Sequence, residues 1–511
     1  MVGEKLGGSF SLSCYNTLMP HEKTHAKSSA TLGWGVFVIL ATAAICIVVG
    51  IPFAPITILA GVGIILFAYA YPYISFGIMV ALIPLLGWYI HIPVENFPFG
   101  ESFFGGSVDV LVGEVVAIAV CAAWGIRVVT LWLRRNDVNW KPWLPLALPM
   151  AGILATHLLS AASPFRPDIL QVIKYTVRPV FWSYLLYVVL TANLIRSNRK
   201  LLAILGVVAA TGVAAALMGF VSLWFPQSAG QIFPRAMPLP MFGISPLGDN
   251  HNLLAEWLNI TTLSTIALIV LMKEKRIRRI LIFAAIFQGV IALLTFARTI
   301  WIVAAFEAVL LAWETRRDLL VKRLPDIFLG ALILLPIAGF MFFFASSSLV
   351  ESSTSTRIML TEIALNVWKD SPLIGSGAGT FVGRIASTAL FTIEFGTPLD
   401  SHGWIQKLLA ETGLAGLVAA AWFVWAFFRL CYSKLRTVFA AVTPERTAFL
   451  LLAVSALGGI MYQLFNTDYW SGKMWFPIGL ALAASRALER RKSEREVTPE
   501  SVNKSTYASL R

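Results

Sequence analysis

The chain has 511 residues, of which 58% are hydrophobic and only 13% are charged. Soluble domains carry about 25% charged residues, so the composition excludes a soluble enzyme and indicates an integral membrane protein. The net charge of +13 could suggest a nucleic-acid partner, but in a membrane chain the basic residues report how the loops are oriented. We therefore expect a lipid bilayer, and no nucleic acid, around this protein.

Apolar segments of near-spanning length recur along the whole chain and predict an all-α fold. A helix needs about 20 mostly apolar residues to cross a bilayer. The predicted spans are residues 33–49, 54–70, 74–90, 108–133, 143–161, 169–195, 201–225, 253–272, 280–295, 299–313, 327–345, 402–430, 448–465 and 474–485. Several of them are short, so we expect a polytopic helix bundle of roughly 12–14 transmembrane helices.

Basic residues cluster in alternate loops, for example in "KEKRIRR" at Lys273–Arg279. Because cytoplasmic loops are enriched in lysine and arginine, these loops are predicted to face the cytoplasm. The loops of the other set hold only scattered cations, which are Arg166, Arg235, Arg298, Arg357, Lys369, Arg384 and Lys473. We expect a cytoplasmic tail at residues 1–32, a transmembrane domain at 33–487 with an extracytoplasmic loop at 346–401, and a cytoplasmic tail at 488–511.

The predicted loop at 346–401 is rich in large apolar residues. It contains Trp368, Phe381, Leu390, Phe391 and Phe395, so it can bury a core of its own and is predicted to be ordered. Its stretch around Ile358 to Val367 has the character of a short amphipathic helix. The "GSGAGTF" stretch that follows is dense in glycine but matches no nucleotide-binding motif, so tight turns are favoured over a phosphate cradle.

Arginine outnumbers lysine in the predicted outer loops, and guanidinium groups grip phosphate with two parallel hydrogen bonds. Arg298 is the most informative, because "TFARTIWIV" leaves it alone in an apolar hairpin. Placing a charge there costs free energy, so an arginine at this position is expected to be functional. Snorkelling to lipid headgroups is the alternative. Arg178 and Lys174 lie four residues apart near a helix end and could bind a ligand or only anchor the helix. The apolar helix around Glu256 requires a partner for that carboxylate, and a neighbouring outer cation is the obvious one.

His402 stands in a polar corner, "DSHG", at the start of a predicted helix. An imidazole with an ordinary pKa near 6.5 can accept a proton from a hydroxyl group. The alternative is an interfacial histidine that only hydrogen-bonds a loop. The four cysteines are far apart, and no HExxH or Asp-x-Asp motif is present, so no disulfide framework, metal site or cofactor is predicted.

Four stretches within residues 230–420 resemble the O-antigen ligase and polymerase superfamily, bacterial membrane glycosyltransferases that use undecaprenyl-diphosphate-linked glycans. The stretches are "PRAMPLPMFGISPLGDNHNLLA", "TFARTIWIV", "STRIMLTEIALNVWKDSPLIGSGAGTF" and "SHGWIQKLLAETGLAGL". By resemblance, His402 matches the functional histidine of the large outer loop and Arg298 matches an arginine in a short hairpin. Arg235 matches the arginine before an Asn-Pro-Asn-like stretch, although His251 stands here where proline is usual.

The resemblance implies a metal-independent glycan ligase or polymerase of the bacterial cytoplasmic membrane. Its donor would be a glycan on a polyprenyl diphosphate, with His402 and Arg298 as catalytic residues and Arg235, Arg178 and Arg357 binding the diphosphate. Lipid A core, another lipid-linked glycan and a protein hydroxyl group all remain open as acceptors. A transporter or flippase is the alternative, because it would also explain many spans. It predicts ionisable residues near the bilayer midplane and discontinuous helices in two related halves. Here the cations of the predicted outer loops gather at one face instead, and the sequence shows no internal symmetry.

Overall fold

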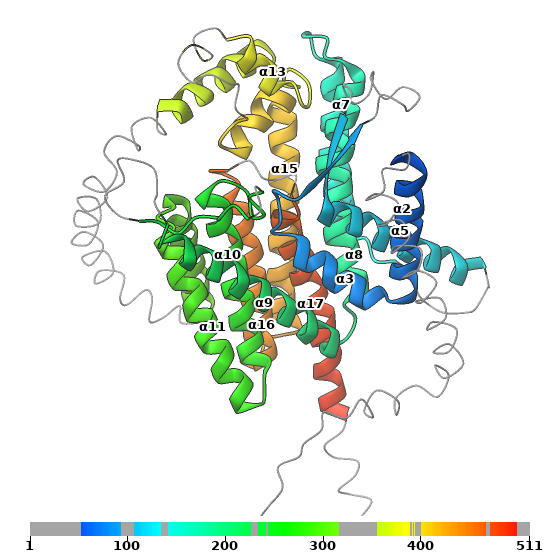
Figure 1. The fold of residues 1–511 in the computed structure, drawn as a ribbon, viewed down its shortest axis with the longest axis vertical. Helices are drawn as coiled ribbons and strands as arrows, with labels where there is room; N and C mark the ends of the chain where they lie inside the picture. Colours follow the sequence, from blue (N-terminus) through cyan, green and yellow to red (C-terminus); the bar gives the residue numbers. More distant parts are fainter. Residues whose placement is uncertain are drawn as a thin grey trace, which may run out of the picture. The chain divides into compact units, whose positions relative to one another are not determined.

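Figure 1 shows the computed structural model. It describes residues 53–93, 107–133, 142–225, 234–241, 244–315, 355–388, 391, 393, 400–466 and 471–497. The predicted N-terminal tail and the spans predicted at 33–49 and 327–345 lie outside the described residues.

The chain divides into two compact units. The smaller unit comprises the chain up to Phe76 together with Ile118–Val138. It contains α2 (Phe53–Ala70) and the later part of α5 (Val112–Leu133). The guanidinium of Arg127 lies 5.0 Å from the centre of the Tyr69 ring and also donates a hydrogen bond to the carbonyl of Tyr69, which holds α5 against α2.

The larger unit, Gly77–Ala117 with Asn139–Arg511, contains most of the membrane helices. Its helices include α6 (Ala147–Leu159), α9 (Asn198–Ser222), α10 (His251–Leu271), α11 (Lys275–Leu294), α15 (Trp404–Thr437), α16 (Pro444–Tyr462) and α17 (Gly472–Val497). Over the part of the chain that the structure describes, seven helices are long and apolar enough to cross a membrane, or eight if α2 and α3 (Pro72–Leu82) count as one bent span. The prediction of an all-α polytopic membrane bundle is therefore confirmed.

Helix α10 is central to the larger unit and packs against α9, α11 and α16. Its Glu256 carboxylate is buried and lies 3.7 Å from the ammonium of Lys473, and it accepts a 2.7 Å hydrogen bond from the Gln463 amide. Removing a charge from water is costly unless it is paired, so this cluster fixes α10 to the ends of α16 and α17. The predicted need of Glu256 for a cationic partner is thus confirmed, and the cation is Lys473, one of the cations predicted to lie outside.

One β-hairpin interrupts the helices. Helix α3 ends at Leu82, and β1 (Tyr89–Pro93) pairs antiparallel with β2 (Ser107–Leu111), with Tyr89 opposite Leu111. The predicted span at 74–90 is therefore wrong at its C-terminal end, and the predicted span at 108–133 is wrong at its N-terminal end. The apolar run "WYIHI" is rich in aromatic and β-branched residues, which suit a strand as well as a helix, and hydropathy alone does not separate the two.

The predicted span at 169–195 is a single long helical stretch with widened turns. It consists of α7 (Ile169–Thr176), two π-helical segments, η3 (Val177–Trp182) and η4 (Tyr184–Val189), and α8 (Leu190–Leu194). Proline removes one backbone hydrogen bond from a helix interior. The π-helical turns around Pro179 accommodate this gap.

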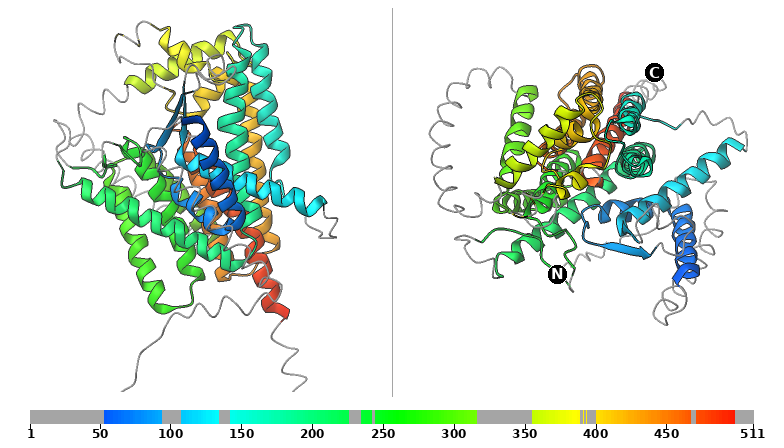
Figure 2. Two further views of the ribbon diagram at one scale, coloured as in Figure 1. Left: turned by 45° about the vertical axis from the view of Figure 1, so that its right-hand side comes forward. Right: turned by 90° about the horizontal axis from the view of Figure 1, so that it is seen from above.

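The two ends of the larger unit differ in the loops they carry. In Figures 1 and 2, the yellow helix at residues 355–370 and α13 (Phe381–Ala386) lie at the end where α15 begins. The connection between α10 and α11 lies at the opposite end together with the end of α17, and the basic Lys273–Arg279 stretch spans this connection and the first residues of α11. Helix α17 runs on to Val497, beyond the predicted limit of the transmembrane domain.

The described part of the large loop has its own core. Leu360 and Ala364, together with Phe381, Ile385 and Phe391, form a buried cluster with Ala410 of α15. The amphipathic helix predicted around Ile358 to Val367 is present at residues 355–370, but Ile358 and Leu365 are exposed and the buried face is set by Leu360 and Ala364. Leu390 and Phe395, also predicted to contribute, lie outside the described residues.

Candidate functional site

His402 lies in the turn before α15. The helix begins at Trp404, with Gly403 as the extended N-cap residue, so the predicted helix start at His402 is too early. The turn is fixed from both sides: the backbone N–H of Trp404 donates to the carbonyl of Gln463 at 2.8 Å, and the Ser401 hydroxyl donates to the carbonyl of Gly403 at 2.9 Å. The end of α16 therefore positions the imidazole.

A small cavity of about 90 Å³ opens beside His402. Arg357, from the helix at 355–370, and Gln406, from the first turn of α15, share its wall. The Nε of Arg357 and the side-chain oxygen of Gln406 are buried without a hydrogen-bond partner. Buried polar atoms are nearly always hydrogen-bonded, so these atoms mark a place where a bound group or water completes the pairing.

The charges around this cavity favour a neutral imidazole. Burial is the main cause that lowers the pKa of His402, the positive charge of Arg357 lowers it further, and Asp400 opposes both. Burial also lowers the pKa of the Arg357 guanidinium, and the charge of Arg298 acts in the same direction. A neutral imidazole can accept a proton, and His402 is therefore competent as a general base near neutral pH.

Arg235 and Arg298 are brought together by the backbone. The N–H of Ala236, next to Arg235, donates to the carbonyl of Leu294 at the end of α11 at 2.8 Å. The tight turn that follows has Phe296 at a φ of 52°, and the next helix, at residues 298–315, begins at Arg298.

His251, at the first turn of α10, lies within electrostatic range of Arg235, Arg298 and Arg357. Three predicted arginines therefore converge on one end of α10, and Arg357 links them to His402. We call Arg235, Arg298 and Arg357 the arginine cluster.

Arg178 is not part of the arginine cluster as the structure arranges it. Its guanidinium pairs with Glu114 of α5 at 3.1 Å and donates to the backbone carbonyl of Asp109 at 2.6 Å. It lines a second, larger cavity of about 420 Å³, whose wall also includes Asp400 and Lys407. The predicted diphosphate ligand Arg178 thus belongs to a different part of the site, and we leave it out of the proposed diphosphate pocket.

The glycine-rich loop interlocks with a break in α15. Gly413 has φ 64° and ψ −161°, which interrupts the helix. The carbonyls of Ala410 and Glu411, freed by the break, accept the N–H groups of Ser376 and Gly377. In return, two N–H groups beyond the break donate to the carbonyls of residues 372 and 373.

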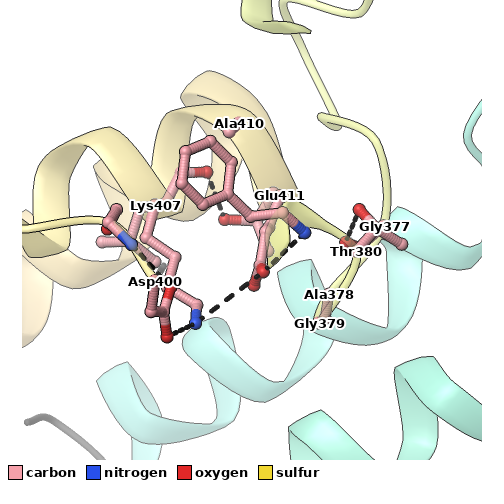
Figure 3. Close-up of polar contacts among 12 residues, drawn as sticks. Gly377, Ala378, Gly379, Thr380, Asp400, Lys407, Ala410 and Glu411 are labelled. Carbon is pink, nitrogen blue, oxygen red and sulfur yellow. Dashed lines mark hydrogen bonds and ion pairs between the residues drawn. The ribbon is translucent and has the colours of Figure 1, made fainter. Parts of the chain in front are cut away.

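Backbone N–H groups of this loop bind a side chain of the protein itself, the carboxylate of Glu411. Figure 3 shows the Glu411 carboxylate directed at the loop, where it accepts the N–H of Phe381 at 3.2 Å, and the N–H of Gly379 also bonds it. Glycines at 375, 377 and 379 all have positive φ. These angles confirm the prediction of turn geometry, and the backbone of the loop already binds the Glu411 carboxylate.

Lys407 connects this loop to the turn of His402. Its ammonium lies 2.5 Å from the Asp400 carboxylate and 4.0 Å from that of Glu411, and the side chain is almost completely buried (Figure 3). Lys407, His251 and Gln406 were not among the site residues predicted from the sequence. The spacing of Lys407 and Glu411, one helical turn apart in an otherwise apolar helix, was the available signal.

Comparison with protein families identifies this region. Residues 283–421 match the family described as O-Antigen ligase. This region of the chain is therefore similar to O-antigen ligases. The match confirms the resemblance to the O-antigen ligase and polymerase superfamily. No curated protein matches the chain.

The matched region includes Arg298, Arg357 and His402, whereas Arg235 precedes it. Within the described part of the chain, no group of three or more His, Cys, Asp or Glu residues is placed to hold a metal ion.

Proposed function

We propose that the protein transfers a glycan from a polyprenyl diphosphate to an acceptor hydroxyl group on the extracytoplasmic side of a bacterial cytoplasmic membrane. The observation that carries the proposal is the contact of Arg357 and His402 with one small cavity, in which the Nε of Arg357 lacks a partner. The similarity of residues 283–421 to O-antigen ligases supports the reaction class.

The arginine cluster would bind the diphosphate. Guanidinium groups stay charged when partly buried, and two parallel N–H groups match phosphate oxygens. In the reaction, the bond between the sugar anomeric carbon and the phosphate oxygen breaks, and the polyprenyl diphosphate leaves with the electron pair. Arg298, Arg235 and Arg357 would stabilise the negative charge that grows on the leaving group.

His402 would act on the acceptor. The acceptor oxygen forms the new bond to the anomeric carbon and loses its proton, which the neutral imidazole accepts. General-base assistance is typically worth about 10² to 10⁴-fold in rate. Because the diphosphate is already a good leaving group, the proposed mechanism uses no metal ion and no strong acid.

The placement of charge supports the proposed orientation. The basic stretch between α10 and α11 lies at the end of the larger unit opposite to α13 and the start of α15 (Figure 1). Because basic loops stay in the cytoplasm, the His402 turn would face outward, with both termini inside. Lipid A core, a second lipid-linked glycan and a protein hydroxyl group are the acceptors to test.

The test is a transfer assay with purified protein in nanodiscs. Undecaprenyl diphosphate carrying a radiolabelled glycan is mixed in turn with lipid A core, with a second lipid-linked glycan and with a hydroxyl-rich protein, with and without EDTA. We expect one acceptor to gain label in both conditions, and Arg298→Gln to reduce the rate at least about a hundredfold. Transfer to none of the three by a protein that binds undecaprenyl diphosphate would contradict the proposal.

A further inference from the structure

The second cavity has the size and chemistry of a carbohydrate site. Its volume of about 420 Å³ falls within the range of about 300–1,000 Å³ found for small-molecule sites. Tyr89 of β1 and Tyr175 of α7 supply aromatic rings, while Asp109, Glu114 and Asp400 supply carboxylates. A cavity with this wall offers hydrogen bonds to hydroxyl groups and flat apolar surfaces to the faces of a sugar ring.

The charges that line this cavity already have partners within the protein. Arg178 is held by Glu114 at 3.1 Å, and Lys407 is held by Asp400 at 2.5 Å. A diphosphate would have to break these pairs to gain its own. A neutral polyhydroxyl ligand can hydrogen-bond to the free sides of paired groups and leave the pairs intact. The wall therefore favours a sugar over the diphosphate.

The two cavities share the segment that carries the proposed base. Asp400 lines the second cavity, whereas Ser401 and His402 line the first. Asp400 is also close enough to act electrostatically on His402. A sugar in the second cavity would thus reach the His402 turn from one side, while a diphosphate at Arg357 would reach it from the other.

We infer that the second cavity binds a pyranose ring of the acceptor glycan and presents one of its hydroxyl groups toward His402. The inference rests on the proposed glycan transfer for its role, but the binding itself does not require catalysis. Sugar binding and diphosphate binding can therefore be measured separately.

The experiment is saturation-transfer NMR on the full protein in nanodiscs. The probes are methyl glycosides of glucose, galactose, rhamnose and N-acetylglucosamine. Tyr89→Ala removes a lining ring that is 58% exposed, so little of the core is lost. The matched control is Trp88→Ala, which truncates a neighbouring exposed aromatic that does not line the cavity. Leu111→Trp fills the cavity from its wall.

We expect at least one glycoside to bind to the wild-type protein. Tyr89→Ala should weaken this binding roughly five- to tenfold, and Leu111→Trp should abolish it. Trp88→Ala should leave the binding unchanged. No binding by any glycoside, or equal binding by the filled variant, would overturn the inference.

Competition distinguishes the source of the sugar. We expect undecaprenyl diphosphate alone not to displace the glycoside, and displacement by it would place the diphosphate here and overturn the inference. Undecaprenyl diphosphate carrying N-acetylglucosamine can act as a donor or as a lipid-linked acceptor, so its competition is repeated in Arg357→Gln. Displacement that is lost in Arg357→Gln would assign the cavity to the donor and overturn the acceptor assignment, whereas displacement that persists in Arg357→Gln supports an acceptor site. Arg357→Gln should weaken undecaprenyl diphosphate but not the glycoside, so a failure of the proposed diphosphate site appears in a different signal.

Discussion

The imidazole of His402 has a cation and a carboxylate as neighbours, and burial decides the balance between them. Burial and Arg357 both lower its pKa, and only Asp400 raises it. The same arginine that would bind the donor therefore keeps the base unprotonated. In the proposed mechanism, substrate binding and proton transfer would be coupled through one guanidinium.

This coupling predicts a pH profile. In the wild-type protein, the acid limb of kcat/KM should lie below the ordinary histidine pKa of about 6.5, because the lowered pKa keeps His402 neutral to lower pH. In Arg357→Gln the loss of the positive charge should raise the pKa and move the limb to higher pH, whatever happens to the rate. Lys369→Gln, at an exposed position on the same helix, is the control. A limb that stays in place in Arg357→Gln would contradict the assignment of His402 as the titrating base.

Arg298 and Arg178 offer a matched comparison of two outer arginines. Arg298→Lys keeps the charge but loses the paired N–H groups, so binding of undecaprenyl diphosphate should weaken about tenfold. Arg178→Lys should leave this binding unchanged, because Arg178 lies in the second cavity against Glu114. Dissociation constants from microscale thermophoresis decide the matter. Equal weakening by both substitutions would return Arg178 to the diphosphate site.

At the scale of elements, the site depends on the interlock between the glycine-rich loop and α15. The break at Gly413 frees backbone groups that the loop then satisfies, and Glu411 and Lys407 extend the contact to Asp400 and the turn of His402. The proposed base is thereby held by a loop that lies about thirty residues earlier in the chain. Loss of the interlock should loosen the turn of His402 without removing any residue of the arginine cluster.

Gly413→Ala tests the interlock. The backbone angles at Gly413 lie in a region essentially restricted to glycine, and a Cβ there would come within 2.5 Å of the backbone of Leu373. We expect a loss of stability of about 2 kcal/mol or more, seen as a lower melting temperature in detergent. Gly383→Ala is the control, since it lies in α13 with open space around it and should be neutral or slightly stabilising. Equal melting temperatures for the two variants would contradict the account.

At the scale of the whole molecule, composition was sufficient to predict the fold class, because a chain with so few charges has no soluble alternative. The β-hairpin was not predictable, since its apolar residues satisfy helix and strand patterns equally well. Arg298 was predicted because a cation in an apolar hairpin is informative by itself, whereas His402 and Arg357 were predicted from polar outer-loop positions together with the family resemblance. The pairing of Lys407 with Asp400, and of Arg178 with Glu114, was not predictable. These pairs depend on how separate segments pack against each other, and a local sequence pattern does not show this packing.

The proposed orientation also belongs to this scale. In a variant without native cysteines, a cysteine at Lys369 should react with a membrane-impermeant maleimide added outside spheroplasts. A cysteine at Lys275, the first residue of α11 within the basic stretch, should react only after the membrane is opened. Both positions are exposed, so a difference in labelling reports sidedness. The reverse pattern would place the arginine cluster in the cytoplasm and contradict the proposed function.

The central claim is that His402 and the arginine cluster divide the reaction between them. The most direct test compares His402→Ala with the wild-type protein in the nanodisc transfer assay, with binding of undecaprenyl diphosphate measured on the same sample. The account predicts that His402→Ala binds undecaprenyl diphosphate like the wild type but transfers glycan about 10² to 10⁴-fold more slowly. Transfer by His402→Ala at the wild-type rate would contradict it.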